Sequence, residues 1–424
     1  MSKTSCIFVE GGHRLSGEVV VSGAKNAALP ALAATLLAPG EYQLFNVPDL
    51  LDIKTMLKLL SLLGAKWHQQ KGSLVINTSL AGKTVAPYEI VNLMRASVLV
   101  LGPLVARAGE ARVARPGGCP IGKRPIDLHL KGLEAMGAKI KMEHGDIVAK
   151  APRRGLSGAE ITFDFPSVTA TENLMMAAVL ARGKTTIRNA AREPEVVFLG
   201  DMLVSMGARI KGHGTETISI EGVKELSPTK IKVIPDRIEA GTYLMAPAVT
   251  GGEVEVKNLC PEHLETVIAT LKEMGLKLEV AQDSILSRPG KRLKPLKVRT
   301  APYPGFPTDL QAQIMAVLST VKGTSVIVEN IFEDRFHHVE ELKRLGADIT
   351  VEGRVAVVNG VKKLQAAPVK ATDLRASASL VLAGLGAEGV TQISEIHHLK
   401  RGYEDLCKKF SGIGAKIWEG PCQH

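Results

Sequence analysis

The chain is poor in aromatic residues and contains no long apolar run. Phenylalanine, tryptophan and tyrosine make up 4% of its 424 residues, and they do not alternate with basic residues as they do on nucleic-acid-binding surfaces. No apolar stretch approaches the roughly 18 residues of a membrane span, and residues 1–14 lack the apolar core of a signal peptide. We therefore expect a cytoplasmic protein that binds no nucleic acid and does not insert into a membrane.

Cysteine is scarce and unpaired in sequence. No Cys-x-x-Cys motif links the five cysteines, which are Cys6, Cys119, Cys260, Cys407 and Cys422. An odd number argues against a disulfide framework. We expect all five to be thiols.

Signatures of metal and cofactor binding are also missing. The adjacent pairs His337–His338 and His397–His398 point in different directions on a helix, and no Cys/His spacing typical of a metal site is present. The chain has neither a phosphate-cradling Walker loop nor a dinucleotide fingerprint. We expect no metal and no cofactor.

What the chain does contain is an internal repeat. Gly-Ala-Lys, or a close variant, ends an apolar helical pattern six times at intervals of 68 to 73 residues. The glycines of these motifs are Gly64, Gly137, Gly207, Gly275, Gly346 and Gly414. Each occupies the position at which a helix C-cap favours a left-handed residue. The spacing predicts six copies of one structural unit of about 70 residues.

Each unit is predicted to run strand, helix, strand, helix, strand, strand. Its first helix is rich in alanine and apolar on nearly all sides, as at 27–38, which indicates burial on most faces. Its second helix is amphipathic, with Leu264, Ile268 and Leu271 on one face. The alternating segment 348–358 is typical of the closing hairpin.

Two similar domains of three units each fit the length of the chain, because 424 residues exceed what one core usually supports. The sixth unit ends early, at 416–420, and we expect residues 6–10 to supply its missing strand. The predicted domains are 24–234 and 1–23 together with 235–424. We expect the active site in the cleft between them.

Polar residues that depart from the repeat lie at helix starts, where free N–H groups and added cations form anion sites. At the first helix of a unit these are Lys25, Asn26, Arg95, Asp309, Asp373 and Arg375; at the second they are Arg124, Asp127, Arg335, Lys400 and Arg401. One arginine at a helix start is more often a surface ion pair. The net charge of +10 points to anionic partners without choosing among phosphate metabolites, nucleic acid and membrane surfaces. The recurrence of these residues at helix starts favours a substrate with more than one phosphate or carboxylate.

The loop 115–127 introduces reactive chemistry. Its glycines and prolines are typical of an active-site lid, and Cys119 lies among Arg115, Lys123 and Arg124. A thiol surrounded by cations next to a helix start favours its thiolate form, which makes it reactive. Cys260 and Cys407 have no such surroundings and fit buried, inert thiols.

Other roles for these residues are less favoured. A cysteine hydrolase needs a histidine beside the thiol, and the nearest in sequence, His129, lies ten residues on along a helix. The carboxylate that stands out is Asp309. It follows the Pro- and Gly-rich segment 301–308 at a helix start, where a base for a hydroxyl group can be held.

Seven segments resemble the enolpyruvyl transferase family, and within it the enzymes that act on UDP-N-acetylglucosamine. They are 22–38, 115–138, 167–178, 192–196, 303–313, 333–347 and 397–406. The resemblance implies an α/β fold: a two-domain inside-out α/β barrel of six repeats, three per domain. It also implies transfer of the enolpyruvyl group of phosphoenolpyruvate to the 3'-hydroxyl of UDP-N-acetylglucosamine, with release of phosphate by addition and elimination. This is the first committed step of peptidoglycan synthesis.

The same resemblance assigns roles to residues. Cys119 would give a proton to the enol carbon, form an adduct with phosphoenolpyruvate and react with fosfomycin, while Asp309 would take the proton of the sugar hydroxyl. The phosphate and carboxylate of phosphoenolpyruvate would be held by Lys25, Arg124 and Arg401, with Asn26, Arg95 and Arg375 nearby. The nucleotide sugar would lie against Arg124, Pro125, Ile126, Asp127, Leu128, Ser167, Val168, Asp309 and Ile331. Arg335 would support cleft closure.

Two positions depart from the family pattern. Phe165 and Pro166 precede Ser167 where some members have a lysine, and Thr169 replaces a usual glycine, which we expect to crowd the nucleotide. The alternatives are a shikimate-pathway enolpyruvyl transferase, which should lack the loop around Cys119, and a non-catalytic paralogue that binds UDP-sugars. The sequence leaves the oligomeric state open.

Overall fold

The structure, a computed structural model, describes residues 5–117 and 125–422. Within these ranges the chain forms two compact units. The central unit consists of 23–117 and 125–234, and the terminal unit of 5–22 and 235–422. No helix in this described part is long and apolar enough to cross a membrane.

Across the described residues, six four-stranded sheets share one topology: a parallel pair at one edge, followed by two antiparallel pairings. The central unit contains β14 (Lys230–Lys232), β3 (Glu41–Phe45), β5 (Ser73–Asn77) and β4 (Lys66–Gln70); β6 (Val85–Ala86), β7 (Glu110–Ala114), β9 (Asp146–Lys150) and β8 (Lys139–Glu143); and β10 (Glu160–Thr162), β11 (Lys184–Arg188), β13 (Thr217–Glu221) and β12 (Arg209–Lys211).

The terminal unit repeats this topology. Its sheets are β2 (Ser16–Val20), β15 (Glu253–Lys257), β17 (Ser284–Pro289) and β16 (Leu276–Val280); β18 (Lys297–Arg299), β19 (Thr324–Val328), β21 (Val355–Asn359) and β20 (Asp348–Glu352); and β23 (Pro368–Lys370), β25 (Val390–Ser394), β1 (Ser5–Glu10) and β26 (Lys416–Pro421). The short strands β22 (Leu364–Gln365) and β24 (Ala387–Glu388) form a separate pair. In the described ranges no strand pairing joins these sheets into a closed barrel.

Each unit also contains helices. The central unit contains α1 (Lys25–Ala34), η1 (Thr35–Leu37), α2 (Leu51–Leu62), α3 (Tyr88–Val91), η2 (Arg95–Val100), α4 (Leu101–Ala108), α5 (Asp127–Ala135), α6 (Val168–Ala178) and α7 (Pro194–Ser205). The terminal unit contains α8 (Arg237–Thr250), η3 (Pro261–Leu264), α9 (Glu265–Met274), η4 (Thr308–Leu310), α10 (Gln311–Leu318), α11 (His338–Arg344), α12 (Leu374–Gly386), η5 (Leu399–Arg401) and α13 (Leu406–Gly412).

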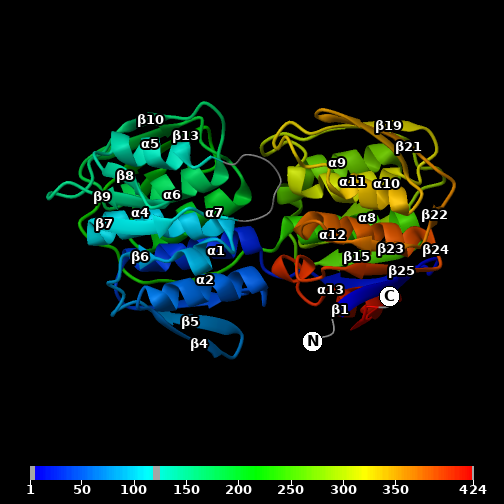
Figure 1. Ribbon diagram of the computed structural model, residues 1–424, viewed down its shortest axis with the longest axis horizontal. Coiled ribbons are helices and arrows are strands. Elements are labelled where there is room, and N and C mark those ends of the chain that lie inside the picture. Colours follow the sequence, from blue (N-terminus) through cyan, green and yellow to red (C-terminus); the bar gives the residue numbers. More distant parts are fainter. Residues whose placement is uncertain (1–4, 118–124, 423–424) are drawn as a thin grey trace. The chain divides into compact units, whose positions relative to one another are not determined.

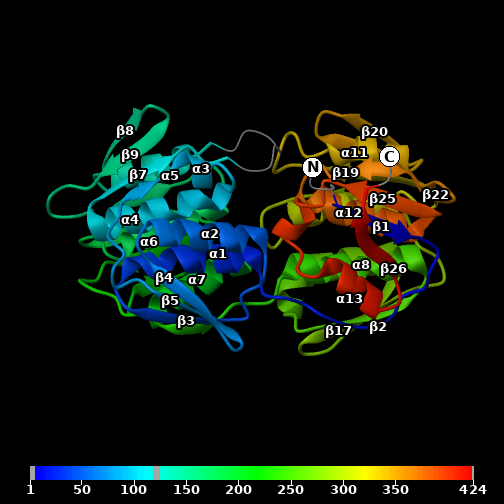
Figure 2. The same cartoon turned by 60° about the horizontal axis from the view of Figure 1, so that its bottom comes forward.

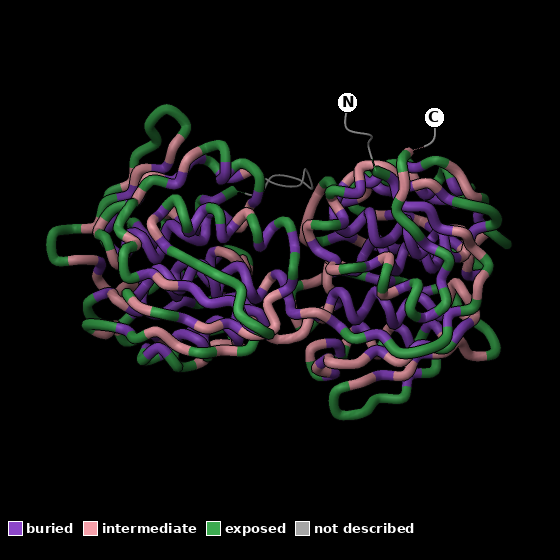
Figure 3. Tube along the Cα trace, turned by 90° about the horizontal axis from the view of Figure 1, so that it is seen from below, coloured by how far each residue is buried: buried purple, intermediate pink, exposed green. Residues whose placement is uncertain are grey.

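The alanine-rich helices are the buried ones, as their composition predicted. In the terminal unit α8, α10 and α12 pack against one another inside the surrounding strands (Figure 1), and every residue of α10 is buried. The helices α1 and α6 are buried along most of their length in the central unit. Figure 3 shows this distribution of burial, with buried residues inside each unit and exposed loops outside.

The repeated glycines end helices in the left-handed conformation. All six have φ angles between 87° and 109°. Residues with a Cβ atom are disfavoured in this region, whereas glycine adopts it freely. The prediction that these six glycines are left-handed residues at helix C-terminal ends is therefore confirmed.

The N-terminal strand completes the last sheet. β1 lies between β25 and β26, with Ile7 opposite both Ile393 and Glu419 (Figure 2). This pairing brings Cys6 to Cys422, whose Cα atoms are 5.0 Å apart, and the two form a disulfide. The expectation that all five cysteines are thiols was wrong, because antiparallel pairing joins residues 416 positions apart in the chain.

Candidate functional site

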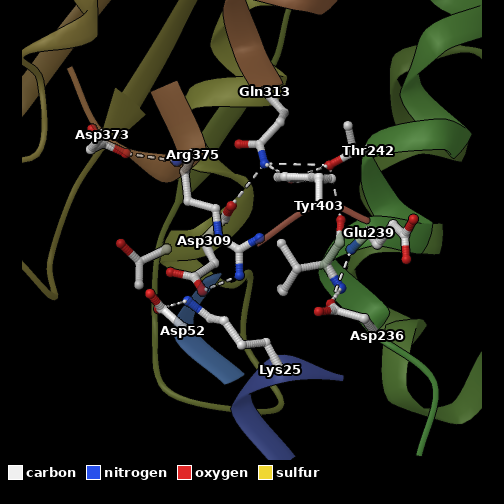
Figure 4. A network of polar contacts seen from close by, with 12 residues as sticks. Lys25, Asp52, Asp236, Glu239, Thr242, Asp309, Gln313, Asp373, Arg375 and Tyr403 are labelled. Carbon is white, nitrogen blue, oxygen red and sulfur yellow. Dashed lines mark hydrogen bonds and ion pairs between the residues drawn. The ribbon is translucent and has the colours of Figure 1, made fainter. Parts of the chain in front are cut away.

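Asp309 lies in η4, directly before α10 in the terminal unit, and Figure 4 shows its carboxylate beside Arg375. Its Oδ1 atom is 2.7 Å from Nη2 of Arg335, and its Oδ2 atom is 2.9 Å from Nη2 of Arg375. The side chains of Arg335 and Arg375 are 7% and 3% exposed, against 25% for Asp309. The carboxylate is therefore the more accessible member of this cluster.

Arg375 is held in place by its own helix and by an aromatic ring. Asp373 caps α12 and accepts hydrogen bonds from the backbone N–H groups of Arg375 and Ala376 at 2.7 and 3.0 Å. The guanidinium lies over the ring of Tyr403, 5.6 Å from its centroid. Burial is the largest single influence on the pKa of Arg375 and lowers it, but the surrounding groups, with Asp309 first among them, together raise it by more, so the pKa is raised overall. The arginine is a permanent cation.

Arg375 also has spare hydrogen-bonding capacity. Its Nε and Nη1 atoms are buried, and neither has a hydrogen-bond partner in the described part of the chain. Buried donors usually have acceptors. Unpaired donors beside an accessible carboxylate indicate a place where a ligand supplies the missing acceptor.

Arg335 belongs to a hydrogen-bond network that sequence reasoning missed. Its Nη1 atom donates to Thr308 Oγ1 at 3.0 Å, and Thr308 donates to Glu329 Oε2 at 2.8 Å. Glu329 is fully buried and accepts hydrogen bonds from the backbone N–H of Ile331 at 2.8 Å and of Phe332 at 3.1 Å. The network positions the segment that contains Ile331. The one signal for this network in the sequence was Glu329 itself, an acidic residue directly after the apolar strand β19.

In the central unit, the predicted Lys25 forms a buried ion pair. Its Nζ atom is 3.0 Å from Oδ2 of Asp52, and the two side chains are 9% and 5% exposed (Figure 4). Lys25 begins α1 and Asp52 lies in the first turn of α2. Burial of an ammonium group is costly unless it is paired. Asp52 was not predicted, although an acid in a first helical turn was a visible signal.

The other predicted residues of the central unit lie at helix starts. Asn26 follows Lys25 in α1, and Arg95 begins η2. The segment from Pro125 to Leu128 leads into α5. Ser167 is the N-cap of α6 and accepts a hydrogen bond from the Ala170 N–H at 3.4 Å, with Val168 as the first helical residue.

The structure also shows where Arg401 and Phe165 lie. Arg401 ends η5 in the terminal unit, and Phe165 is exposed to 53%. Cys119 and Arg124 lie outside the described residues. Among the thiols within the described ranges, burial raises the pKa of Cys260, and it raises that of Cys407 to about 12, so both favour the protonated form.

Known proteins similar to this chain are carboxyvinyltransferases. The sequence profile of EPSP synthase (3-phosphoshikimate 1-carboxyvinyltransferase) matches residues 9–410. A UDP-N-acetylglucosamine 1-carboxyvinyltransferase of Geotalea uraniireducens is 54% identical over 97% of this chain and 98% of its own. A UDP-N-acetylglucosamine 1-carboxyvinyltransferase 2 of Carboxydothermus hydrogenoformans is 56% identical over 96% and 98%.

A solved structure shows the same fold. The enolpyruvyl transferase NikO from Streptomyces tendae superposes with a TM-score of 0.89 at 25% sequence identity, covering 99% of this chain and 100% of its own. The agreement extends over both units rather than one. The mixed α/β sheets described above are thus those of an enolpyruvyl transferase fold.

Proposed function

Because the chain belongs to the EPSP synthase family of enolpyruvyl transferases, we propose that it transfers the enolpyruvyl group of phosphoenolpyruvate to the 3'-hydroxyl of UDP-N-acetylglucosamine. Phosphate is the second product. The observation that carries this proposal is the extent of the match to carboxyvinyltransferases of that nucleotide sugar, which runs over 97% of the chain. The buried cations Lys25 and Arg375 fit a substrate with a phosphate and a carboxylate.

The reaction is an addition followed by an elimination. The sugar oxygen bonds to C2 of phosphoenolpyruvate while C3 gains a proton, and the resulting tetrahedral intermediate then loses phosphate and a proton from C3. Cys119 supplies the proton to C3 in this proposal, and Asp309 accepts the proton of the hydroxyl group. Lys25, Arg124 and Arg401 hold the phosphate and carboxylate. Fixed cations stabilise the charge that develops on the leaving group.

The ion pairs of Asp309 bear on its role as a base. Both carboxylate oxygens accept a hydrogen bond from a guanidinium group, and such bonds favour the ionised form of a carboxylate. A hydroxyl group approaches the carboxylate productively when it takes over one of these positions. Arg335 is the partner we propose for exchange, since its second donor remains bound to Thr308.

The finer features of the family complete the proposal. We place the active site between two three-repeat domains in the inside-out barrel arrangement, with boundaries at 24–234 and at 1–23 plus 235–424. The reaction would be the first committed step of peptidoglycan synthesis, carried out in the cytoplasm. Fosfomycin would alkylate Cys119.

One alternative acceptor is shikimate 3-phosphate, because the matching family profile carries the name of that enzyme. The cysteine-centred loop 115–127 argues against it. Phosphate release from phosphoenolpyruvate, measured with each acceptor in turn, separates the two. Release only with UDP-N-acetylglucosamine supports the proposal, and release only with shikimate 3-phosphate overturns it. Release with neither, combined with binding of the nucleotide sugar, would identify a non-catalytic UDP-sugar-binding protein.

A further inference from the structure

Ser22 is the last residue of the terminal unit before the chain passes into the central unit. Its backbone N–H donates to Oε2 of Glu239 at 2.8 Å, and its carbonyl oxygen accepts the N–H of Asp236 at 2.9 Å. Its hydroxyl group donates to Glu404 and accepts a hydrogen bond from Nζ of Lys409 at 2.7 Å. Every polar group of this serine is therefore paired, which fixes both its backbone and its side chain.

Glu239 joins these contacts into one cluster. It lies in the first turn of α8, near Asp236, and its side chain is 2% exposed (Figure 4). One carboxylate oxygen accepts the N–H of Ser22, and the other is 2.5 Å from Nζ of Lys409. A protonated carboxyl group carries a hydrogen on one oxygen and no longer pairs with the ammonium charge. Only the ionised form of Glu239 therefore holds both partners.

Two residues separate Ser22 from Lys25, and packing fixes both. A Cβ atom on Gly23 would lie 1.8 Å from the carbonyl oxygen of the residue that follows β3, so only glycine fits there. Ala24 is 1% exposed and donates its N–H at 2.7 Å to the carbonyl oxygen of Ile234, the last residue before the chain crosses back. Lys25 then begins α1. A shift of Ser22 is therefore carried to the start of this helix.

Among the described residues, three titratable side chains face Glu239 directly. Lys409 comes from α13, Asp236 caps α8, and Tyr243 lies one turn further along α8. Burial raises the pKa of Glu239 to about 7, and Asp236 adds to this rise, while Lys409 and the Ser22 N–H lower it. Burial also raises the pKa of Tyr243 well above its ordinary value, so the phenol stays protonated. Glu239 therefore changes its charge near neutral pH.

We propose that Glu239 is a positioning residue for Lys25: by holding the backbone of Ser22, it places the start of α1 where the lysine binds phosphoenolpyruvate. This inference rests on the proposed function, in which Lys25 holds the phosphate or carboxylate of that substrate. Because only the ionised carboxylate holds both Ser22 and Lys409, affinity for phosphoenolpyruvate is full above pH 7. It falls as Glu239 gains a proton below that pH.

The test measures the Kd of phosphoenolpyruvate by calorimetry at pH 6 and pH 8. We expect the unaltered protein to bind about tenfold more weakly at pH 6, because the ionised fraction of a group with a pKa of about 7 falls by that factor. Glu239→Gln keeps the shape without the charge, so it should bind weakly at both pH values. The titration of phosphoenolpyruvate itself is common to all the proteins compared and cancels.

Glu340→Gln is the matched control. Glu340 is also the third residue of a helix and pairs with a lysine, Lys343, at 2.9 Å, but its side chain is 76% exposed. Exposed pairs contribute little. This variant should therefore bind phosphoenolpyruvate as the unaltered protein does at both pH values.

Lys409→Met tests the same link from the other partner. The charge of Lys409 lowers the pKa of Glu239, so its removal should move the step in affinity to higher pH, which a purely structural loss would not do. This shift decides alone if Glu239→Gln does not fold, as judged by thermal melting. An unshifted step in Lys409→Met, or in Glu239→Gln either tight binding at pH 8 or a persistent step, would overturn the inference. If the unaltered protein binds no phosphoenolpyruvate at either pH, the proposed function itself has failed, which is a different outcome.

Discussion

Arg375 and Asp309 form an ion pair in which Nη2 lies 2.9 Å from Oδ2, with the arginine almost completely buried and the carboxylate partly accessible. The arginine is fixed by the cap of α12 and by Tyr403, and its Nε and Nη1 donors have no hydrogen-bond partner in the described ranges. Binding of an anion would satisfy these donors. The pair therefore places a partly accessible carboxylate beside a buried cation that has unused donors.

Replacing Asp309 should damage turnover more than binding. We expect Asp309→Asn to lower kcat by about 10²- to 10⁴-fold, the usual contribution of a positioned general base. Calorimetry should show phosphoenolpyruvate binding close to normal. Asp348→Asn, on the exposed strand β20, is the matched control. Loss of phosphoenolpyruvate binding in Asp309→Asn would instead assign this residue a structural role.

Removing the carboxylate of Asp52 should destabilise the central unit. In Asp52→Ala the buried Lys25 ammonium loses its partner, which typically costs about 3–5 kcal/mol. The exposed pair of Lys54 and Asp49, with Nζ and Oδ1 2.7 Å apart, provides the control. Asp49→Ala should change the unfolding free energy little, because exposed pairs contribute little. Similar losses in the two variants, measured by urea unfolding, would contradict the distinction.

The disulfide should stabilise the terminal unit, because it joins the strands that complete the last sheet. We expect Cys422→Ser to lower the unfolding free energy by about 2–4 kcal/mol. Reductant should have the same effect on the unaltered protein and none on the variant. Cys260→Ser controls for the loss of a thiol. Identical denaturation midpoints with and without reductant would argue against a stabilising disulfide.

Burial of His129 predicts acid sensitivity. Its pKa is lowered to about 3 in the folded protein, below the ordinary value of about 6.5. Between these values the unfolded chain binds more protons, so the stability from this group is complete above pH 6.5 and is lost as pH falls towards 3. The loss is at most about 1.4 kcal/mol per pH unit. His129→Gln should flatten this part of a stability profile measured by urea unfolding.

Glu239 predicts the opposite dependence and serves as an internal comparison. Burial raises its pKa to about 7 despite the nearby Lys409. The folded protein therefore binds more protons between the ordinary value of about 4.3 and pH 7, and stability falls as pH rises through this window. Glu239→Gln should flatten that fall. If the unfolding free energy of His129→Gln and of Glu239→Gln depended on pH in the same way, both pKa assignments would be refuted.

Cys119→Ser should abolish turnover or slow it severely while the melting temperature is preserved. Fosfomycin, an epoxide, should label Cys119 and leave Cys260 and Cys407 unmodified, because burial raises the thiol pKa of both. Peptide mapping identifies the labelled residue. A label on Cys407, or near-normal phosphate release by Cys119→Ser, would remove the thiol from the proposed mechanism.

Several features of the molecule follow from local sequence alone. The left-handed glycines such as Gly64 and Gly275, and the burial of alanine-rich helices such as α10, could be predicted because helix caps and helix faces depend on neighbouring residues. The sequence also singled out Asp309 and Arg375 as candidates, since each breaks a repeated pattern at a helix start. The pairing of the strand at 6–10 with the sixth repeat could be predicted because that repeat lacked its last strand.

Other features depend on residues that are distant in sequence. Asp52 pairs with Lys25, Glu329 supports Arg335 through Thr308, and Cys6 meets Cys422. No periodicity records these contacts, because they arise only when the chain folds and brings helix ends and sheet edges together. The sequence thus determined the repeating elements and their caps. The partners of each buried charge were decided by tertiary packing, because a charge removed from water needs a counter-charge whose position only the folded chain defines.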